Sequence, residues 1–283
     1  MIIPDGVRAS CGSDPTRLEW LHRLRDSINE LTRRWGVTLG APYDDASCSW
    51  VAPAKRRDGS AVVLKIGMPH FEAEHEIAGL RFWDGDPMVR LLDADEDGNA
   101  MLLEHCEPGT TLRALSTPEQ DAVIAALIRR CWRRLRDAHP FRPLSTLMAY
   151  WRAESMSQSA RWPDAGLVTA GLRLFDELSR TAERKVLLAT DLHAGNVLRA
   201  EREPWLVIDP KPFVGDPAFD ATQHLLNGRD RLRTAPHDTI RRFSDLLGVD
   251  QERVGLWLFA RLAGEPRAVW DERTMALARA LTP

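Results

Sequence analysis

Apolar residues recur at helical spacing near the start of the chain. Over residues 14–35 they follow one face of a helix. Asp14 or Ser13 suits the N-cap, Pro15 suits the first turn, and Gly36 is a stop signal. The pattern therefore predicts an amphipathic helix over residues 14–35. Its apolar stripe consists of Leu18, Leu21, Leu24, Ile28, Leu31 and Trp35.

After Gly36 the apolar residues fall into shorter runs. Residues 47–52 and 61–66 predict two strands, and the polar turn at 56–59 predicts that they form a hairpin. Residues 70–83 return to helical spacing and carry several glutamates. Two more short strands are expected at 88–92 and 101–103.

The second half of the chain is mainly helical in pattern. Thr117 suits the N-cap of a helix, with Pro118 in its first turn and Gln120 at the capping-box position. The strand-like pieces in this half flank the segment from Asp191 to Asp209. Further helices are expected at 167–178, 240–247, 251–262 and 273–281.

The change of pattern at residues 106–111 predicts a boundary between two lobes. Pro108 and Gly109 interrupt regular structure there. We expect an α+β protein with a small antiparallel-sheet lobe over residues 1–104 and a larger helical lobe over residues 105–283.

Composition narrows the classes of function. A net charge of -3, with 44% hydrophobic and 28% charged residues, is ordinary for a globular protein and gives no support to nucleic-acid or anionic-membrane binding. Without an apolar run of about 18 residues, no membrane span is expected. The opening residues do not resemble a signal peptide, and the four scattered cysteines suit neither a disulfide framework nor a zinc site, so we expect a cytoplasmic protein. A basic run is expected on a solvated helix face and comprises Arg129, Arg130, Arg133, Arg134 and Arg136.

The segment 186–217 carries the residues best suited to chemistry. Asp191 lies in a polar loop, Asn196 follows five residues later, and Asp209 ends a second apolar run. An aspartate in such a loop can orient a hydroxyl nucleophile. Asparagine and aspartate oxygens suit Mg²⁺, a hard cation. The spacing predicts a phosphoryl-transfer site, with Asp191 as base and Asn196 and Asp209 as metal ligands.

A lysine within an apolar strand is the second candidate. Lys65 either contacts nucleotide phosphates, held by a glutamate of the following helix, or points to water from an edge strand. Glu72 and Glu76 lie on one helix face, and Glu76 is preferred because its neighbours are apolar. The connector that includes Glu104 and Cys106 is expected to bind adenine through its backbone groups.

Several polar residues near the loop have two interpretations. His193 suits either a contact to substrate or a bond that stiffens the loop, and Lys211 suits either a phosphate contact or simple exposure. For Asp216 and Asp220, structural roles, as helix caps or as supports for the loop, are favoured over contacts to a cationic substrate.

Together these motifs resemble the aminoglycoside phosphotransferases, which share the protein-kinase-like fold, and within them the aminoglycoside/hydroxyurea resistance kinases. The resemblance rests on Lys65, a helix glutamate, the loop 191–196 and residues 208–210, with TDLHAGNVL as the most specific stretch. It implies a bilobal fold, Asp191 as catalytic base, Asn196 and Asp209 as Mg²⁺ ligands, and ATP (or GTP) as phosphate donor.

The chain departs from this family in two places. Ala189 and Thr190 stand where the family commonly has His-Gly, so a different support for Asp191 is needed. A glycine-rich phosphate loop is poorly matched, and Ser47, Cys48 and Ser49 are the candidates to cover the phosphates.

The resemblance implies a small cationic antibiotic as acceptor and a monomer or weak dimer. Streptomycin-like aminoglycosides and tuberactinomycins such as capreomycin or viomycin fit this class. A hydroxyurea or metabolite kinase and a nucleotide-binding pseudokinase are the alternatives. Acidic residues of the helical lobe that could hold a cationic acceptor are Glu154, Asp164, Asp216, Asp220, Glu265, Asp271 and Glu272.

Overall fold

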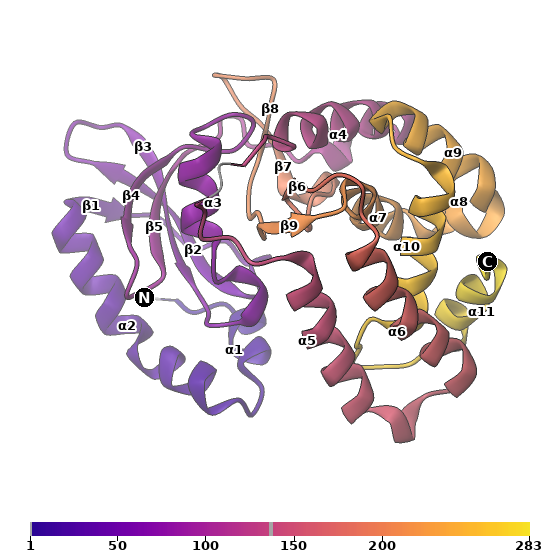
Figure 1. The fold of residues 1–283 in the computed structure, drawn as a ribbon. Helices are drawn as coiled ribbons and strands as arrows, with labels where there is room; N and C mark the ends of the chain where they lie inside the picture. The colour runs from indigo at the N-terminus through magenta and orange to yellow at the C-terminus, as the bar shows by residue number, and fades with distance from the viewer. Residues whose placement is uncertain (1, 136–137) are drawn as a thin grey trace. The chain divides into compact units, whose positions relative to one another are not determined.

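The computed structural model describes residues 2–135 and 138–283 and has an α+β fold (Figure 1). The chain divides into two compact units. The N-terminal unit comprises Met1–Thr110 and Leu198–Ile208, and the C-terminal unit comprises Thr111–Val197 and Asp209–Pro283. Within the described residues, no helix combines the length and the apolar character that a membrane span requires.

A five-stranded antiparallel sheet forms the centre of the N-terminal unit. Its strand order is β1-β2-β3-β5-β4, so β3 is the central strand. The predicted hairpin is confirmed as β2 and β3, although β2 runs four residues beyond the predicted end. The later pair of strands is also confirmed, shifted by up to three residues. The bounds are β1 (Val37–Leu39), β2 (Ser49–Arg56), β3 (Ala61–Gly67), β4 (Leu91–Asp95) and β5 (Ala100–Glu104).

The predicted amphipathic helix is confirmed as α2 (Pro15–Trp35), which follows α1 (Asp5–Cys11). Asp14 is the N-cap, since its Oδ1 accepts the N–H of Thr16 at 2.9 Å. Gly36 ends the helix with a left-handed φ of 62°. An aspartate cap and a glycine stop therefore fix both ends where the sequence placed them.

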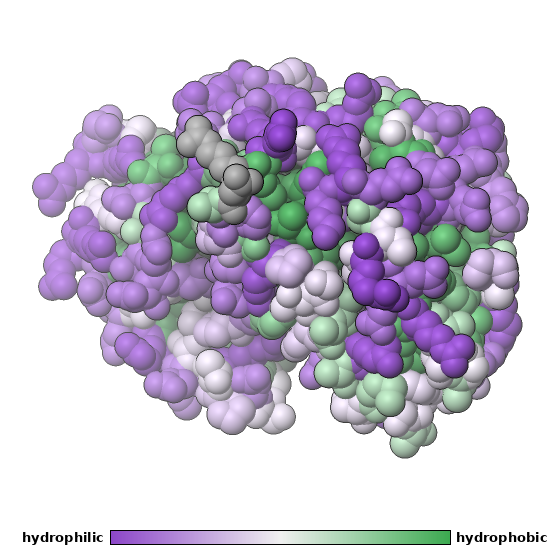
Figure 2. Space-filling view, viewed as in Figure 1, coloured by the Kyte–Doolittle hydropathy of each residue, from purple (hydrophilic) through white to green (hydrophobic). Residues whose placement is uncertain are grey.

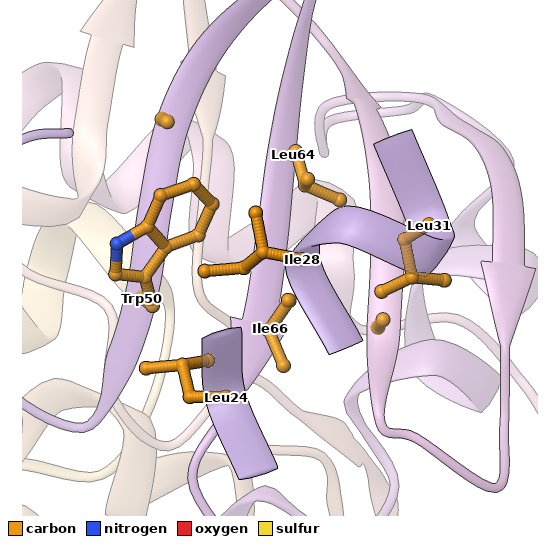
Figure 3. Close-up of a cluster of buried hydrophobic side chains, with 8 residues drawn as sticks. Leu24, Ile28, Leu31, Trp50, Leu64 and Ile66 are labelled. Carbon is orange, nitrogen blue, oxygen red and sulfur yellow. The ribbon is translucent and has the colours of Figure 1, made fainter. Parts of the chain in front are cut away.

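The apolar stripe of α2 packs on the sheet (Figures 1 and 3). Leu24, Ile28 and Leu31 are almost fully buried. Because such side chains each contribute roughly 1.5–3 kcal/mol on burial, this contact stabilises both the helix and the sheet. The sheet side of the cluster comprises Trp50, Ala52, Leu64, Ile66 and Ala100.

The single helix predicted over residues 70–83 is wrong in its first half. A short 3₁₀ turn (Phe71–Ala73) precedes α3 (Glu76–Trp83), because His75 adopts a non-helical ψ of 19° between them. The hairpin of β7 (Val197–Arg199) and β8 (Trp205–Val207) joins the N-terminal unit, where Val207 donates its N–H to the carbonyl of Pro87 at 3.1 Å.

Helices make up most of the C-terminal unit. All of the predicted helices are present, with ends that differ by up to four residues, while α5, α7 and α8 were not predicted. The central helix is α10, which contacts α6, α7, α9 and α11 (Figure 1). The helices are α4 (Thr117–Cys131), α5 (Leu144–Ser157), α6 (Ala165–Arg180), α7 (Pro217–Asn227), α8 (Arg229–Thr234), α9 (Pro236–Leu247), α10 (Gln251–Gly264) and α11 (Glu272–Ala280).

Two details of α4 correct the sequence predictions. Its N-cap is Ser116 instead of Thr117, and Glu119 accepts the backbone N–H of Ser116 at 2.9 Å. The helix ends at Cys131, so the expected basic face does not continue along it: only Arg129 and Arg130 lie on α4. Arg133 and Arg134 follow the helix, and Arg136 lies outside the described residues.

Candidate active site

Lys65 and Glu76 form a buried ion pair in the N-terminal unit. Lys65 Nζ donates to Glu76 Oε1 at 2.6 Å, and the two side chains are 8% and 3% exposed. Lys65 lies on the central strand β3, opposite Val51 and Met101, so the edge-strand interpretation is wrong. Glu76 is the first residue of α3, directly after the break at His75. A buried ammonium requires such a partner, because an isolated charge is very costly to bury.

The connector residue Glu104 uses its side chain to hold the N-terminal unit together. Arg202 donates to both of its carboxylate oxygens, at 2.8 and 2.9 Å, and Arg90 donates its backbone N–H at 3.0 Å. Burial works to raise the pKa of Glu104, but these donors outweigh it and lower the pKa. Burial raises the pKa of the Cys106 thiol to about 12, so it remains neutral. Their contact with adenine stays a prediction.

The catalytic-loop candidate begins in the C-terminal unit, at the end of β6 (Val186–Leu188), which pairs with β9 (Phe213–Gly215). Thr190 has a left-handed φ of 50°, which is strained for a β-branched residue. Its hydroxyl donates to the carbonyl of Lys211 at 2.6 Å. The backbone conformation of Thr190, held by this hydrogen bond, therefore fixes the chain directly before Asp191.

Asp220 supplies the support that Ala189 and Thr190 lack. Its carboxylate accepts the N–H groups of Thr190 at 2.9 Å and Ala189 at 3.3 Å, and the indole N–H of Trp132 at 2.9 Å. Asp220 is 1% exposed, and burial raises its pKa to about 6 while the three donors favour the ionised form. One buried carboxylate on α7 therefore fixes the backbone before Asp191.

Asp191 is held by two side chains that come later in the chain. Gln223 Nε2 donates to Oδ1 at 2.6 Å, and Lys211 Nζ donates to Oδ2 at 2.7 Å. Gln223 was not predicted, and Lys211 contacts Asp191 instead of being simply exposed. His193 accepts the N–H of Gly195 at 3.0 Å, and burial lowers the pKa of its ring. A neutral His193 thus stiffens the loop.

Asn196 precedes the β7–β8 hairpin and Asp209 follows it, and each has a side-chain oxygen that can bind a metal ion. Asn196 Nδ2 donates to the backbone carbonyl of Asp191 at 3.0 Å, which directs its amide oxygen to a different partner. Asp209 has a left-handed φ of 56°, a conformation that aspartate tolerates. An amide and a carboxylate oxygen fit Mg²⁺. Throughout residues 2–135 and 138–283, no three His, Cys, Asp or Glu side chains form a metal site, so an ion here would also need phosphate oxygens.

A cavity of about 1170 Å³ lies beside the loop 191–196, and all of its lining residues belong to the C-terminal unit. His193, Ala194 and Gly195 line it together with Gln223. Its volume is enough for a drug-sized acceptor. The cavity therefore brings a candidate acceptor space next to the loop that carries Asp191.

Of the acidic residues that could hold a cationic acceptor, only some line this cavity. Glu265 and Asp271 line the cavity, whereas Asp216 is buried, caps α7 and accepts a 2.7 Å bond from Trp257. Asp220 supports the loop as described above. The remaining candidates are not among the lining residues: Glu154, Asp164 and Glu272.

Comparison with known proteins gives a consistent result. A family model described as aminoglycoside/hydroxyurea antibiotic resistance kinase matches residues 34–274. A streptomycin 6-kinase of Streptomyces glaucescens is 34% identical over 267 residues, covering 89% of this chain and 84% of that protein. A hydroxyurea phosphotransferase of Kitasatospora aureofaciens is 32% identical over 281 residues, covering 93% and 80%.

The similarity of fold extends to more distant proteins. The choline kinase LicA of Streptococcus pneumoniae has a TM-score of 0.62 at 14% identity, covering 92% of this chain and 91% of that one. At this identity the likeness concerns the fold alone. It places the α+β architecture of the chain among those of small-molecule kinases.

Proposed function

Because this chain belongs to the aminoglycoside/hydroxyurea antibiotic resistance kinases, we propose that it transfers the γ-phosphate of ATP or GTP to a hydroxyl of a streptomycin-like aminoglycoside. The observation that carries this proposal is Asp191, whose carboxylate is held by Gln223 and Lys211 and whose preceding backbone is held by Asp220, beside a drug-sized cavity. Streptomycin 6-kinases at 34% identity over most of the chain support this acceptor over other hydroxyl compounds.

We assign binding of the donor nucleotide to the residues that the sequence predicted for it. Lys65, oriented by Glu76, would contact the phosphates, and the connector at Glu104 and Cys106 would hold adenine through its backbone. Asn196 and Asp209 would hold Mg²⁺, which supplies charge neutralisation at the phosphates. Kinases of this type work mainly by positioning and electrostatics, and each of these residues has a fixed partner or backbone conformation that suits that task.

Asp191 would receive the proton of the acceptor hydroxyl. A general base must lie within hydrogen-bond distance of the hydroxyl and hold its own orientation. Gln223 fixes one carboxylate oxygen, and Lys211 contacts the other. The positive charge of Lys211 would stabilise the ionised carboxylate of Asp191 after one product has left and before the next acceptor binds. Phosphorylation places an anionic group on a drug that relies on cationic groups and free hydroxyls, and so inactivates it.

Hydroxyurea is the second candidate acceptor, because a hydroxyurea phosphotransferase is nearly as similar to this chain as the streptomycin kinase. A tuberactinomycin or a metabolite acceptor has no comparable support. A pseudokinase is disfavoured because Lys65, Asp191, Asn196 and Asp209 are all retained.

Protection of a susceptible host tests the proposed function. The chain and its Asp191→Asn variant are expressed at equal levels in a streptomycin-sensitive strain, and growth is measured against streptomycin, hydroxyurea and capreomycin. We expect protection against streptomycin by the wild type and none by the variant. Protection against hydroxyurea alone would assign the second acceptor. Growth without protection against any drug would refute antibiotic inactivation.

A further inference from the structure

Arginine dominates the walls of the cavity beside the catalytic-loop candidate. The lining includes six arginines and three acidic residues. Like charges gathered around one concavity attract ligands of opposite sign. The arginines are Arg113, Arg229, Arg231, Arg233, Arg261 and Arg267, and the acids are Asp230, Glu265 and Asp271.

The acidic residues of this cavity are already engaged. Glu265 contacts Arg261 through both carboxylate oxygens, at 2.9 and 3.1 Å. Asp230 pairs with Arg233 at 2.9 Å. Asp271 caps α11, where it accepts the N–H and the hydroxyl of Thr274. Within the described residues none of the three forms a salt bridge with a further guanidinium, although hydrogen bonds from Thr274 and the charges of Arg229 and Arg267 lower the pKa of Asp271.

A third arginine has its partner outside the lining. Arg231 Nη1 contacts both oxygens of Asp121 at 2.6 Å, and the Asp121 carboxylate also accepts a hydrogen bond from His224 Nε2 at 2.7 Å. The side chains of these three residues are at most 20% exposed. This network satisfies the charge of Arg231.

Three guanidinium groups remain without a carboxylate partner. In the described part of the chain, no carboxylate oxygen lies within 4.0 Å of the guanidinium nitrogens of Arg113, Arg229 or Arg267. Arg229 donates to the carbonyl of Leu226 at 3.2 Å and to the Thr274 hydroxyl at 3.1 Å. These neutral acceptors orient the guanidinium, and its charge is opposed at longer range by Asp271.

Arg267 is the most buried of the three. It donates to the carbonyls of Glu265 at 3.0 Å and Arg261 at 2.9 Å, and its guanidinium lies 5.0 Å from the ring centroid of Trp270. Burial lowers the pKa of Arg267; the charges of Glu265 and Asp271 oppose this effect, and those of Arg229 and Arg261 reinforce it. A bound anion would raise this pKa.

Arg113 reaches the cavity from the side of the catalytic loop. A Cβ atom built on Gly195 would lie 2.5 Å from Arg113 Nη2, so the guanidinium rests directly against this glycine. Nε of Arg231, a buried donor among the lining residues, also has no hydrogen-bond partner within the described residues. The walls thus hold donor capacity that the described residues do not use.

We propose that this cavity binds an oxyanion, a phosphate or carboxylate group, with Arg113, Arg229 and Arg267 as its ligands. Guanidinium groups present a planar set of N–H donors that matches such anions and can bind them in pairs. The cavity is much larger than one phosphate, so there is room for the anion beside an acceptor or as part of a larger organic molecule.

Titration calorimetry with inorganic phosphate tests this site. The nucleotide site is first saturated with Mg²⁺ and a non-hydrolysable ATP analogue, so that phosphate cannot bind there. The protein is compared with Arg229→Gln/Arg267→Gln and with Arg113→Gln. The matched control is Arg152→Gln/Arg241→Gln, which removes two arginines that pair with Asp176 and Asp238 on exposed helix surfaces outside the cavity.

We expect saturable binding at one site in the wild type and in the control. Removing two charged donors should weaken binding by about tenfold or more, and Arg113→Gln should weaken it by about threefold or more. Far-UV circular dichroism checks the fold. If the double variant does not fold, Arg113→Gln decides the outcome, since Arg113 makes no hydrogen bond within the described residues. Absence of binding in the wild type, or equal affinity in the variants and the control, would overturn the site.

Glucose 6-phosphate and glucose distinguish the two sources of the anion. Tighter binding of glucose 6-phosphate than of inorganic phosphate would assign the site to the anionic group of an organic molecule. Equal affinity would assign it to free phosphate, and glucose serves as the neutral control. These titrations need no turnover, so they can succeed when streptomycin is not phosphorylated and fail when it is.

Discussion

In each unit of the molecule a lysine and a carboxylate form a close pair, and the two pairs are nearly equal in length. Lys65 and Glu76 are 2.6 Å apart, and Lys211 and Asp191 are 2.7 Å apart. The first pair is 8% and 3% exposed and joins a central strand to a helix, whereas the second is 20% and 15% exposed and joins two loops. The first is suited to a fixed orientation, and the second is open enough for Asp191 to exchange a partner for an acceptor.

The surroundings of the two pairs differ as much as their exposure. The pair in the N-terminal unit lies on the sheet whose other face packs on α2, while the pair in the C-terminal unit lies near a large polar cavity. Figure 2 shows mainly hydrophilic residues on one face of the chain, with hydrophobic residues exposed among them. The same interaction is therefore enclosed by a strand and a helix in one unit and lies near a cavity in the other.

The largest effect is expected from Asp191→Asn. If Asp191 is the base, kcat should fall by about 10²- to 10⁴-fold, because the amide cannot accept the proton. The Kd for nucleotide should not change, since the substitution keeps the shape of the side chain. Steady-state kinetics and calorimetry measure the two quantities, with Asp176→Asn as an exposed control. A variant that retains wild-type kcat would remove Asp191 from this role.

Next in size is the response of the buried pair. Lys65→Met leaves Glu76 buried without its partner, which should lower the free energy of unfolding by about 3–5 kcal/mol. Lys65→Met/Glu76→Leu removes both charges and should recover most of that stability while still failing to bind nucleotide. Urea unfolding and nucleotide titration separate these outcomes. A double variant that binds nucleotide normally would show that the pair is only structural.

Asp220→Asn should produce an intermediate effect. The amide accepts fewer N–H bonds than the carboxylate, so the free energy of unfolding should fall by about 1.5–3 kcal/mol. Because the loop before Asp191 loosens, kcat should fall while the nucleotide Kd stays constant. Unfolding curves and kinetics of the same preparation test both. Reduced stability with unchanged kcat would contradict a positioning role.

The smallest effects concern pH, and they have opposite signs in the two units. The folded pKa of Asp220 is raised to about 6, so its contribution to stability is full below about 4 and is lost as pH rises through 6. The pKa of Glu104 is lowered, so its contribution is present above about 4.3 and is lost as pH falls. The stability lost in Asp220→Asn should therefore shrink from pH 4 to pH 7, and that lost in Glu104→Gln should grow. If the stability lost in the two variants changed with pH in the same direction, both pKa directions would be contradicted.

How far the sequence predicts each region follows from where the partners lie along the chain. Lys65 and Glu76 are 11 residues apart, in a strand and a helix with clear apolar patterns, and their pairing was predicted. Asp220, 30 residues after Thr190, supports the loop, a structural role that the sequence favoured, whereas Gln223, 32 residues after Asp191, was not predicted. Such contacts depend on how α7 packs, which no local pattern records.

The same reasoning explains the errors in the fold. Helix α5 begins after Pro143 without a side-chain cap, so the sequence carries no start signal. The break at His75 is a backbone feature inside a continuous apolar pattern. The arginine-lined cavity collects side chains from α8, α10 and the segments beside them, and so it becomes visible only once those elements are assembled.

Mass spectrometry of streptomycin tests the central claim most directly. The purified protein is incubated with Mg²⁺, ATP and streptomycin, in parallel with Asp191→Asn. The account predicts that the drug gains one phosphoryl group on a hydroxyl with the wild type and remains unmodified with the variant. Streptomycin that stays unmodified with the folded, nucleotide-bound wild type, or that is phosphorylated equally by both proteins, would contradict it.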